Sequence, residues 1–115
     1  MSARGWSVYV VVCGDKSLYA GLSSDVDARV GAHNAGRGAR YTRSRTPVRL
    51  RWHWRCANSE DARRLEGLLK QLTRAAKLRV IAGEPAVLGP LLCEVARRRR
   101  QQKTQGPAAT RRGRP

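Results

Sequence analysis

The sequence predicts an α+β fold, part of the α/β class in the broad sense, in which a small three-stranded antiparallel sheet is flanked by helices. Three observations lead to this class. The chain has 115 residues, enough for one domain with a modest core. Its apolar and β-branched residues give the order strand, strand, helix, strand, helix, helix. A turn signal at residues 14–17 joins the first two strands into a hairpin.

The hairpin consists of a strand over 6–13, rich in β-branched and aromatic residues, and a returning strand over 18–22. Because side chains alternate between the two faces of a strand, Tyr9 and Tyr19 share a face only if the numbers of paired residues add to an even number. A three-residue loop that pairs Cys13 with Ser17 meets this condition. A two-residue turn would place the tyrosines on opposite faces.

The first helix follows the hairpin directly. Ser23 or Ser24 is expected to cap its N-terminus, and acidic residues in its first turn suit the helix dipole. The helix is expected to end near Gly36 or Gly38. Residues 40–47 are then expected to form a polar, basic loop.

The third strand is predicted over 48–56, with Trp52 and Trp54 on one face and His53 on the other. The Asn58–Ser59 pair supplies a cap for the second helix. The core stripe expected along that helix comprises Ala62, Leu65, Leu69 and Leu72.

The C-terminal part of the chain is predicted in three pieces. A short helix should reach about Val80, residues 83–90 should form a break, and 91–100 should form a last helix. From Gln101 onward large apolar residues are almost absent, which predicts disorder. The expected division is therefore a domain over 1–82, a helical extension over 83–100 and a disordered basic tail over 101–115.

The net charge of +16 points to a polyanionic partner. Eight lysines and arginines lie from Arg97 onward with no acidic residue among them, so half of the net charge lies in the tail. The segment 37–55 carries seven arginines with aromatic residues between them, a composition typical of nucleic-acid surfaces. Core packing of the tryptophans is the alternative interpretation of those aromatics.

The three cysteines are odd in number and far apart, which argues against both a disulfide framework and a zinc site. The N-terminus carries no apolar signal segment, and no apolar run approaches the ~20 residues that span a bilayer. We therefore expect a cytoplasmic protein that does not contact a membrane. The sequence leaves the oligomeric state open, and a monomer is expected.

Glu66 is the first candidate for chemistry, because helical periodicity places it beside the core stripe of the second helix. A carboxylate in that position is costly unless it is paired or binds a cation. The alternative is a surface ion pair with Lys70 or Arg63, one helical turn away.

Arg29 and His33 lie four residues apart and therefore on one helix face. An arginine there can hold two phosphate oxygens, although a solvated arginine and a half-buried structural histidine are the simpler interpretations. Tyr9, Tyr19 and Tyr41 are the only tyrosines of a chain that has no phenylalanine. Each alone could be an ordinary packed aromatic residue.

Together these features resemble the GIY-YIG nuclease superfamily, and in particular its small stand-alone bacterial members. The two tyrosine blocks read Ser7-Val8-Tyr9 and Tyr19-Ala20-Gly21, where the family has Gly-Ile-Tyr and Tyr-Ile-Gly. The turn at 33–42 is similar to the block HNxGxGAxYT of those bacterial members. The resemblance covers roughly residues 6–80.

The resemblance implies a metal-dependent endonuclease that acts on DNA and leaves a 3′-hydroxyl and a 5′-phosphate. Tyr9 would be the general base and Glu66 the protein ligand of Mg²⁺ or Mn²⁺. A phenol is a poor base at its ordinary pKa of ~10, so the metal, an arginine and a lysine are expected to favour the phenolate. The residues expected to hold the phosphate and water are Tyr19, Arg29, His33 and Tyr41. The residues expected to bind nucleic acid are Arg37, Arg40, Arg43, Arg45 and Lys70.

Two other functions are compatible with the same sequence. One is a basic nucleic-acid-binding protein on the same fold with weak or no cleavage. The other is a basic protein associated with RNA or the ribosome, which is the less favoured of the two. The sequence favours DNA over RNA as the partner, and it does not distinguish duplex, branched and single-stranded substrates.

Overall fold

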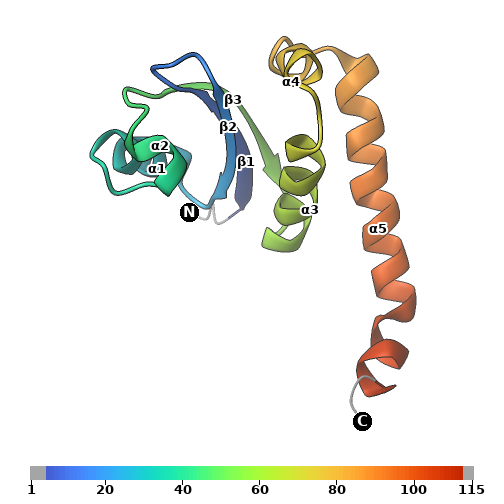
Figure 1. The fold of residues 1–115 in the computed structure, drawn as a ribbon. Helices are drawn as coiled ribbons and strands as arrows, with labels where there is room; N and C mark the ends of the chain where they lie inside the picture. The colour runs from blue at the N-terminus through green and yellow to red at the C-terminus, as the bar shows by residue number, and fades with distance from the viewer. Residues whose placement is uncertain (1–4, 113–115) are drawn as a thin grey trace.

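The computed structural model describes the backbone of residues 5–112 and the side chains of residues 5–102. Its antiparallel sheet has the order β2-β1-β3. Helices α1 and α2 cover one face of the sheet, α3 covers the other, and α5 lies behind α3 (Figure 1). The fold class predicted from the sequence is confirmed. The strands are β1 (Trp6–Val12), β2 (Leu18–Ser23) and β3 (Arg49–Cys56), and the helices are α1 (Val26–Asn34), α2 (Arg40–Arg43), α3 (Ser59–Lys70), α4 (Arg74–Ile81) and α5 (Pro85–Arg112).

The β1–β2 hairpin has the predicted three-residue loop. The Cys13 amide donates to the Ser17 carbonyl at 2.8 Å, and the Lys16 amide donates to the Cys13 carbonyl at 2.9 Å. Lys16 has a φ of 72°, the left-handed conformation expected at the last position of such a loop. Tyr19 pairs with Val11, two residues after Tyr9 on β1. Both tyrosines therefore share one face of the sheet, as predicted.

Helix α1 has a different N-cap from the one expected, but it ends near Gly36 as predicted. Its cap is Asp25, whose carboxylate accepts the Ala28 amide at 3.1 Å, because the Ser23 hydroxyl already contacts the backbone of Asp25. The helix ends at Asn34, and Gly36 follows with a φ of 81°. This glycine lets the chain leave the helix in a left-handed turn.

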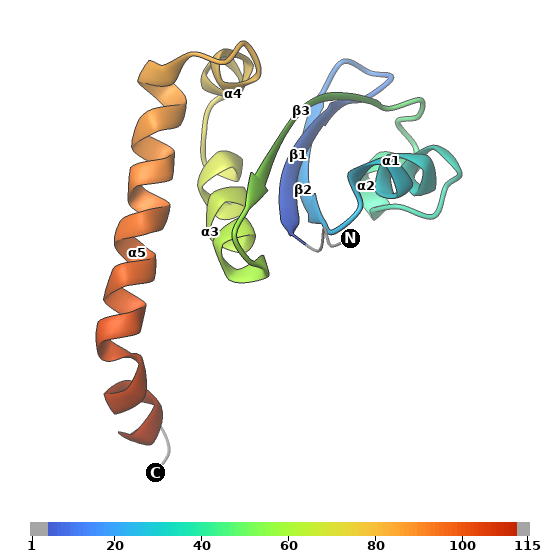
Figure 2. The same cartoon turned by 180° about the vertical axis from the view of Figure 1, so that it is seen from behind.

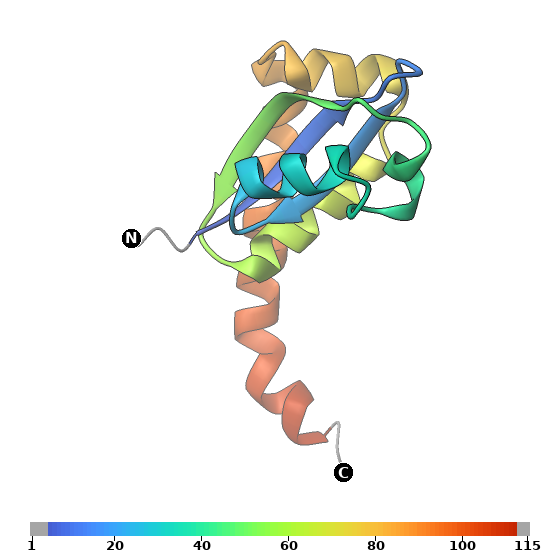
Figure 3. The same cartoon turned by 90° about the vertical axis from the view of Figure 1, so that its left-hand side faces the viewer.

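The segment predicted as a basic loop contains the short helix α2. Asn34 holds the far end of this segment: its side chain accepts the Val48 amide at 2.7 Å and donates to the Val48 carbonyl at 3.0 Å. Strand β3 therefore starts one residue later than predicted, at Arg49. Figure 3 shows α1 crossing the face of the sheet in front of the three strands.

Strand β3 places its tryptophans and histidine as predicted. Trp52 lies opposite Val10, and His53 lies opposite Tyr9. A register shift between Val10 and Val11 leaves Arg51 as an extra residue on β3, a β-bulge.

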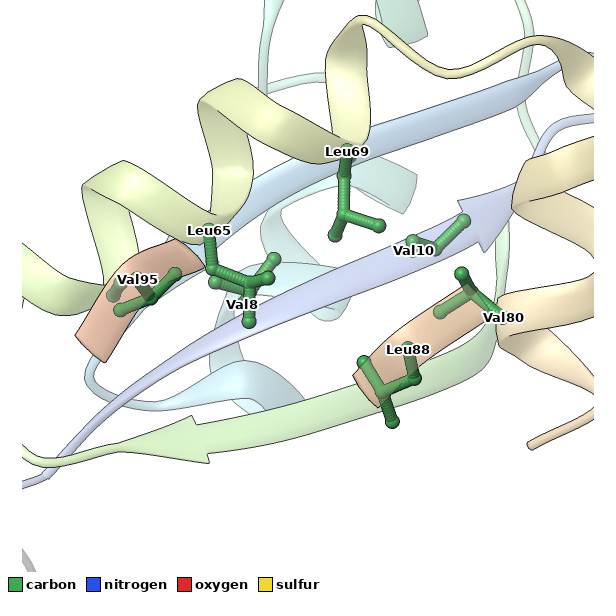
Figure 4. Close-up of a cluster of buried hydrophobic side chains, with 9 residues drawn as sticks. Val8, Val10, Leu65, Leu69, Val80, Leu88 and Val95 are labelled. Carbon is green, nitrogen blue, oxygen red and sulfur yellow. The ribbon is translucent and has the colours of Figure 1, made fainter. Parts of the chain in front are cut away.

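The apolar core lies between the sheet and the helices α3, α4 and α5. Asn58 caps α3 by accepting the Asp61 amide at 2.8 Å, as expected from the sequence. Figure 4 shows the centre of this core, formed by Val8 and Val10 of β1, Leu65 and Leu69 of α3, Val80 of α4, and Leu88 and Val95 of α5.

The last helix is longer than predicted. It starts at Pro85, since proline suits the first turn of a helix, so the break shrinks to the two residues after Ala82. The backbone of 101–112 continues this helix, where the composition predicts disorder, because arginine, glutamine, lysine and alanine favour helix even without a core to face. Residues 113–115 lie outside the described residues. The helix runs past the end of the sheet (Figure 2). The division into three segments stays a prediction.

Arg99 of α5 ties this helix to α3 by charge. Asp61 is 1% exposed; its Oδ1 accepts a hydrogen bond from Arg64 Nη1 at 2.6 Å. Its Oδ2 lies 2.9 Å from Arg99 Nη2, a charge contact whose angles fall short of a hydrogen bond. Within the described part of the chain, no helix has the length and apolar character required to cross a membrane.

Candidate active site on the α1 face of the sheet

A chain of buried hydrogen bonds links β1, α1 and α2 on the face of the sheet that α1 covers. The Tyr9 hydroxyl lies 2.8 Å from His33 Nε2, and His33 Nδ1 lies 2.7 Å from Thr42 Oγ1. Thr42 in turn donates to the Ala39 carbonyl at 2.9 Å. Tyr9 is 1% exposed, and His33 and Thr42 are fully buried. The three side chains therefore form one closed polar unit, the Tyr9–His33–Thr42 network.

Two glycines make room for this network. Gly21 on β2 lies opposite Tyr9, and a Cβ there would lie 2.5 Å from the Tyr9 hydroxyl oxygen. The phenol therefore crosses directly over the backbone of the edge strand. Gly38 lies against the His33 ring so closely that a Cβ would overlap Nδ1. Both positions require the absence of a side chain.

A stack of aromatic rings lies next to the network. The Tyr19 ring meets His33 edge-on at 5.5 Å and stacks on Tyr41 at 5.8 Å with 17° between the planes. Tyr41 is 38% exposed, so the stack runs from the buried histidine to the surface. The Arg45 guanidinium lies 3.9 Å from the centre of the Tyr41 ring and binds Asp15 at 3.0 Å.

Arg29 and Glu66 reach the same place from opposite layers. Arg29 on α1 and Glu66 on α3 both influence the pKa of the Tyr9 phenol: after burial, which has the largest effect and raises it, Arg29 lowers the pKa and the charge of Glu66 raises it. Glu66 Oε2 lies 3.2 Å from Lys70 Nζ, which is 5.9 Å from the centre of the Tyr19 ring. The ion pair with Lys70 that the sequence left as an alternative is therefore present.

The Tyr9 hydroxyl and the His33 ring are both neutral at rest. Burial raises the pKa of Tyr9 above its ordinary value, and the hydrogen bond and charge of Arg29 only partly oppose this effect. Burial, and then the charge of Arg29, lower the pKa of His33. The protein groups alone therefore do not favour the phenolate, because desolvation outweighs Arg29, and the expectation that a metal, an arginine and a lysine together favour it stays a prediction.

The structure also bears on the roles expected of His33 and Arg45. His33 was expected to hold phosphate or water, yet its ring is fully buried and contacts Tyr9 and Thr42 instead. Arg45 was expected to bind nucleic acid, but Asp15 already offsets its charge. The other arginines of that set, Arg37, Arg40 and Arg43, are exposed on and beside α2.

Glu66 fits a hydrated divalent ion. Its side chain is 18% exposed, and the Lys70 ammonium contact shows that a cation is accommodated at its carboxylate. Among the described residues, no three histidine, cysteine, aspartate or glutamate side chains gather as a metal cluster. A single carboxylate whose remaining partners are water and substrate oxygens suits Mg²⁺, which retains much of its hydration.

Thr42 is the residue of this site that the sequence prediction missed. Its signal was present at the end of the basic turn, where a hydroxyl follows the predicted Tyr41 directly. A threonine in a loop was not distinguishable from a solvated one until α2 turned it toward His33.

Comparison with known proteins matches residues 5–79 to the GIY-YIG catalytic domain. A UPF0213 protein of Lacticaseibacillus paracasei is 46% identical over 77 residues, which are 67% of this chain and 86% of the relative. One from Halobacterium salinarum is 50% identical over 70 residues, 61% of this chain and 91% of the relative. The solution NMR structure of a UPF0213 protein from Bacillus halodurans is 39% identical and covers 70% of this chain and 85% of its own, with a TM-score of 0.47.

Proposed function

Since this chain belongs to the GIY-YIG domain family, whose catalytic domain supports an endonuclease-like function, we propose that it is a metal-dependent endonuclease that hydrolyses phosphodiester bonds in DNA. One observation carries the proposal. Tyr9, Tyr19, Arg29 and Glu66 come from three layers of the fold, and all four interact around the Tyr9 phenol or the ring that touches it.

Tyr9 is the general base in this proposal, and His33 is its proton acceptor. His33 Nε2 takes the phenol proton, and the phenolate then takes a proton from the attacking water as its oxygen bonds to phosphorus. The bond from phosphorus to the 3′-oxygen breaks in the same step, and the departing 3′-oxygen takes up a proton from solvent to become the 3′-hydroxyl. Arg29 offsets the charge that develops on the phosphate oxygens. Tyr19 and Tyr41 orient the phosphate from the exposed side of the aromatic stack.

Glu66 is the residue that would hold Mg²⁺ or Mn²⁺ in this proposal. Such an ion, when bound, offsets the charge of the phosphate and lowers the pKa of nearby phenol and water. Lys70 would leave Glu66 for a phosphate oxygen as the carboxylate takes up its new partner. Arg37, Arg40 and Arg43 would contact the DNA backbone on either side, without sequence preference.

A second function is favoured by the burial of Tyr9. A base that is 1% exposed and has a raised pKa activates no water until the site opens. The alternative is a basic nucleic-acid-binding protein with weak or no cleavage, for which the exposed arginines suffice. RNA remains the second choice of polymer, as the charge alone does not separate it from DNA.

The deciding experiment is cleavage of supercoiled and branched DNA by wild-type protein and by Glu66→Gln, with Mg²⁺, Mn²⁺ or EDTA. The substitution removes the charge but little volume, so cleavage should fall by on the order of 100-fold or more. DNA binding should stay nearly unchanged, because the arginines supply it. Stability should change by less than about 0.5 kcal/mol, the value of an ion pair one helical turn apart.

Glu60→Gln is the matched control, since Glu60 is an exposed glutamate on the same helix. It should cleave as wild type does. Full cleavage by Glu66→Gln would refute the assigned metal ligand. A wild-type protein that binds DNA but cleaves nothing with either metal would establish the binding function instead.

A further inference from the structure

We propose that Thr42 is a positioning residue that fixes the tautomer of His33, so that the Nε2 lone pair faces the Tyr9 hydroxyl. The inference deepens the proposed function, since it concerns the group that accepts the proton of the general base. It rests on the hydrogen-bond pattern around one fully buried imidazole ring.

The argument is a count of protons along the network. A neutral imidazole has one N–H and one lone pair, and a threonine hydroxyl has a single proton to donate. The Thr42 hydroxyl donates that proton to the Ala39 carbonyl at 2.9 Å. Its oxygen, 2.7 Å from His33 Nδ1, must then accept, so Nδ1 carries the proton. Nε2 is left with the lone pair, and the Tyr9 hydroxyl at 2.8 Å donates to it.

The opposite tautomer leaves the proton of the buried Tyr9 hydroxyl without the acceptor that Nε2 provides. With the proton on Nε2, Tyr9 would accept from both His33 and Arg29, and its own proton would need another acceptor. Thr42 would have to turn away from the Ala39 carbonyl to donate to Nδ1. The only added contact would be the Ala39 amide, at 3.4 Å from Nδ1, which is long for a hydrogen bond. With the proton on Nδ1, both hydroxyls and both ring nitrogens have a partner, and the long contact from the Ala39 amide is left unused; in a buried site this arrangement has the lower energy.

The observed arrangement gives every hydrogen bond one direction, from Tyr9 through His33 and Thr42 to the Ala39 carbonyl. Transfer of the phenol proton breaks the O–H bond of Tyr9 and forms an N–H bond at Nε2. The resulting imidazolium has both N–H groups satisfied, one by the phenolate and one by Thr42. Without the Thr42 oxygen, the Nδ1 proton would lie buried with no acceptor, at a cost to the charged ring.

The position of the hydroxyl is built into the fold. Thr42 lies in α2, three residues after Ala39, a spacing at which a threonine side chain reaches back to a carbonyl of its own helical turn. Gly38 brings the same segment against the His33 ring. Helix α2 and Gly38 together place the Thr42 oxygen beside His33 Nδ1 as a hydrogen-bond acceptor rather than a donor.

The test is the tautomer itself, measured by ¹⁵N NMR of the histidine side chains in the full-length protein. Wild type should show a protonated Nδ1 and an unprotonated Nε2 at His33. Thr42→Val, which keeps the shape and loses the hydroxyl, should shift His33 toward the other tautomer. Thr42→Ser should restore the wild-type signal, and the exposed His53 serves as the internal reference in every sample.

Cleavage is the second readout. Thr42→Val should lower kcat by roughly 10- to 100-fold, the range found when the partners that orient metal-binding histidines are removed, with KM little changed. Thr42→Ser should recover most of it. A loss without rescue by serine would refute the positioning role.

The tautomer readout stands without any activity. If wild type shows the proton on Nε2, or if Thr42→Val leaves the tautomer as in wild type, the positioning role is refuted even where cleavage is intact. If the tautomers behave as expected and no variant cleaves DNA, the endonuclease proposal fails and the assignment of Thr42 stands. Should Thr42→Val not fold, the wild-type and serine tautomers still decide.

Discussion

The face of the sheet toward α1 buries polar side chains beside a small apolar cluster that includes Val11, Cys13 and Val48, whereas the face toward α3 and α5 buries mainly aliphatic ones. On the first face Tyr9, His33 and Thr42 are held by hydrogen bonds to one another and to the Ala39 carbonyl. On the second, leucines and valines pack without any such requirement. The difference shows that alternate residues of one strand, β1, contribute to two different structures, the Tyr9–His33–Thr42 network and the aliphatic core.

The two faces also differ in how far the family match extends. The match ends at residue 79, yet Leu88 and Val95 of α5 are buried in the core of the second face. The polar face is therefore contained in the part of the chain that resembles the family. The apolar face is completed by a helix that lies beyond it, and α5 acts here as part of the core.

Removal of α5 should have the largest effect on this comparison. A chain that ends at Glu84 loses two buried side chains, each worth about 1.5–3 kcal/mol, and uncovers others on α3. Against a total stability of roughly 5–15 kcal/mol, this chain should lose its cooperative thermal transition. Circular dichroism during heating measures it.

A chain that ends at Gln102 is the matched control, because it keeps the buried residues and Arg99. It should melt near the temperature of the full chain. If the chain that ends at Glu84 also melts cooperatively at that temperature, α5 does not contribute to the stability of the core. The two faces would then not differ in their dependence on a helix beyond the family match.

Arg99→Met should have a smaller effect on the same face. It keeps the aliphatic stem but leaves the buried Asp61 with Arg64 alone, which should cost about 1–3 kcal/mol. Arg98→Met is the control, since its partner Glu94 is a solvent-accessible carboxylate and such ion pairs contribute little to stability. Urea denaturation of both variants compares them, and equal losses would show that Asp61 does not need α5.

The smallest expected effect belongs to the polar face and depends on pH. Burial lowers the pKa of His33 in the folded chain. In mildly acidic solution the unfolded chain therefore binds a proton at this histidine that the folded chain does not bind. The contribution of His33 to folding stability is fully present above about pH 6.5, the pKa of histidine in the unfolded chain. It is lost as the pH falls from there through the pKa of His33 in the folded chain. The melting temperature should therefore drop over that range.

Two variants assign this loss. His33→Gln should flatten the dependence on pH, whereas His53→Gln, which changes the exposed histidine, should retain it. A decline that persists unchanged in His33→Gln would mean that carboxylates, and not the polar face, set the acid sensitivity.

The sequence predicted part of each face: the shared face of Tyr9 and Tyr19 on the polar side, and the core stripe of Ala62, Leu65 and Leu69 on the apolar side. The alternation along β1 and the three-residue loop were enough to place Tyr9 and Tyr19 together, because strand geometry leaves only two faces. Burial of His33 could not be predicted in the same way. It depends on Gly38 and α2 folding over the ring, which is a tertiary contact with no periodic signal.

The start of α5 was hidden by its prolines and glycine. Pro85, Gly89 and Pro90 indicate a break when the segment is considered alone. Packing of Leu88 and Val95 on the core favours helix by more than the local preference opposes it. The asparagine cap of α3 was predicted because its partner lies three residues away, within the same segment.

Gly21 has a consequence for how such a protein tolerates variation. It carries no functional group, yet a methyl group there would occupy the space of the Tyr9 hydroxyl oxygen. In a library of all single substitutions, position 21 should therefore tolerate as little as the residues that handle protons, while Gly67, which has open space around it, should accept alanine freely. A map of the site drawn only from side chains that can react would leave out Gly21 and Gly38, where the absence of a side chain makes room for the Tyr9–His33–Thr42 network.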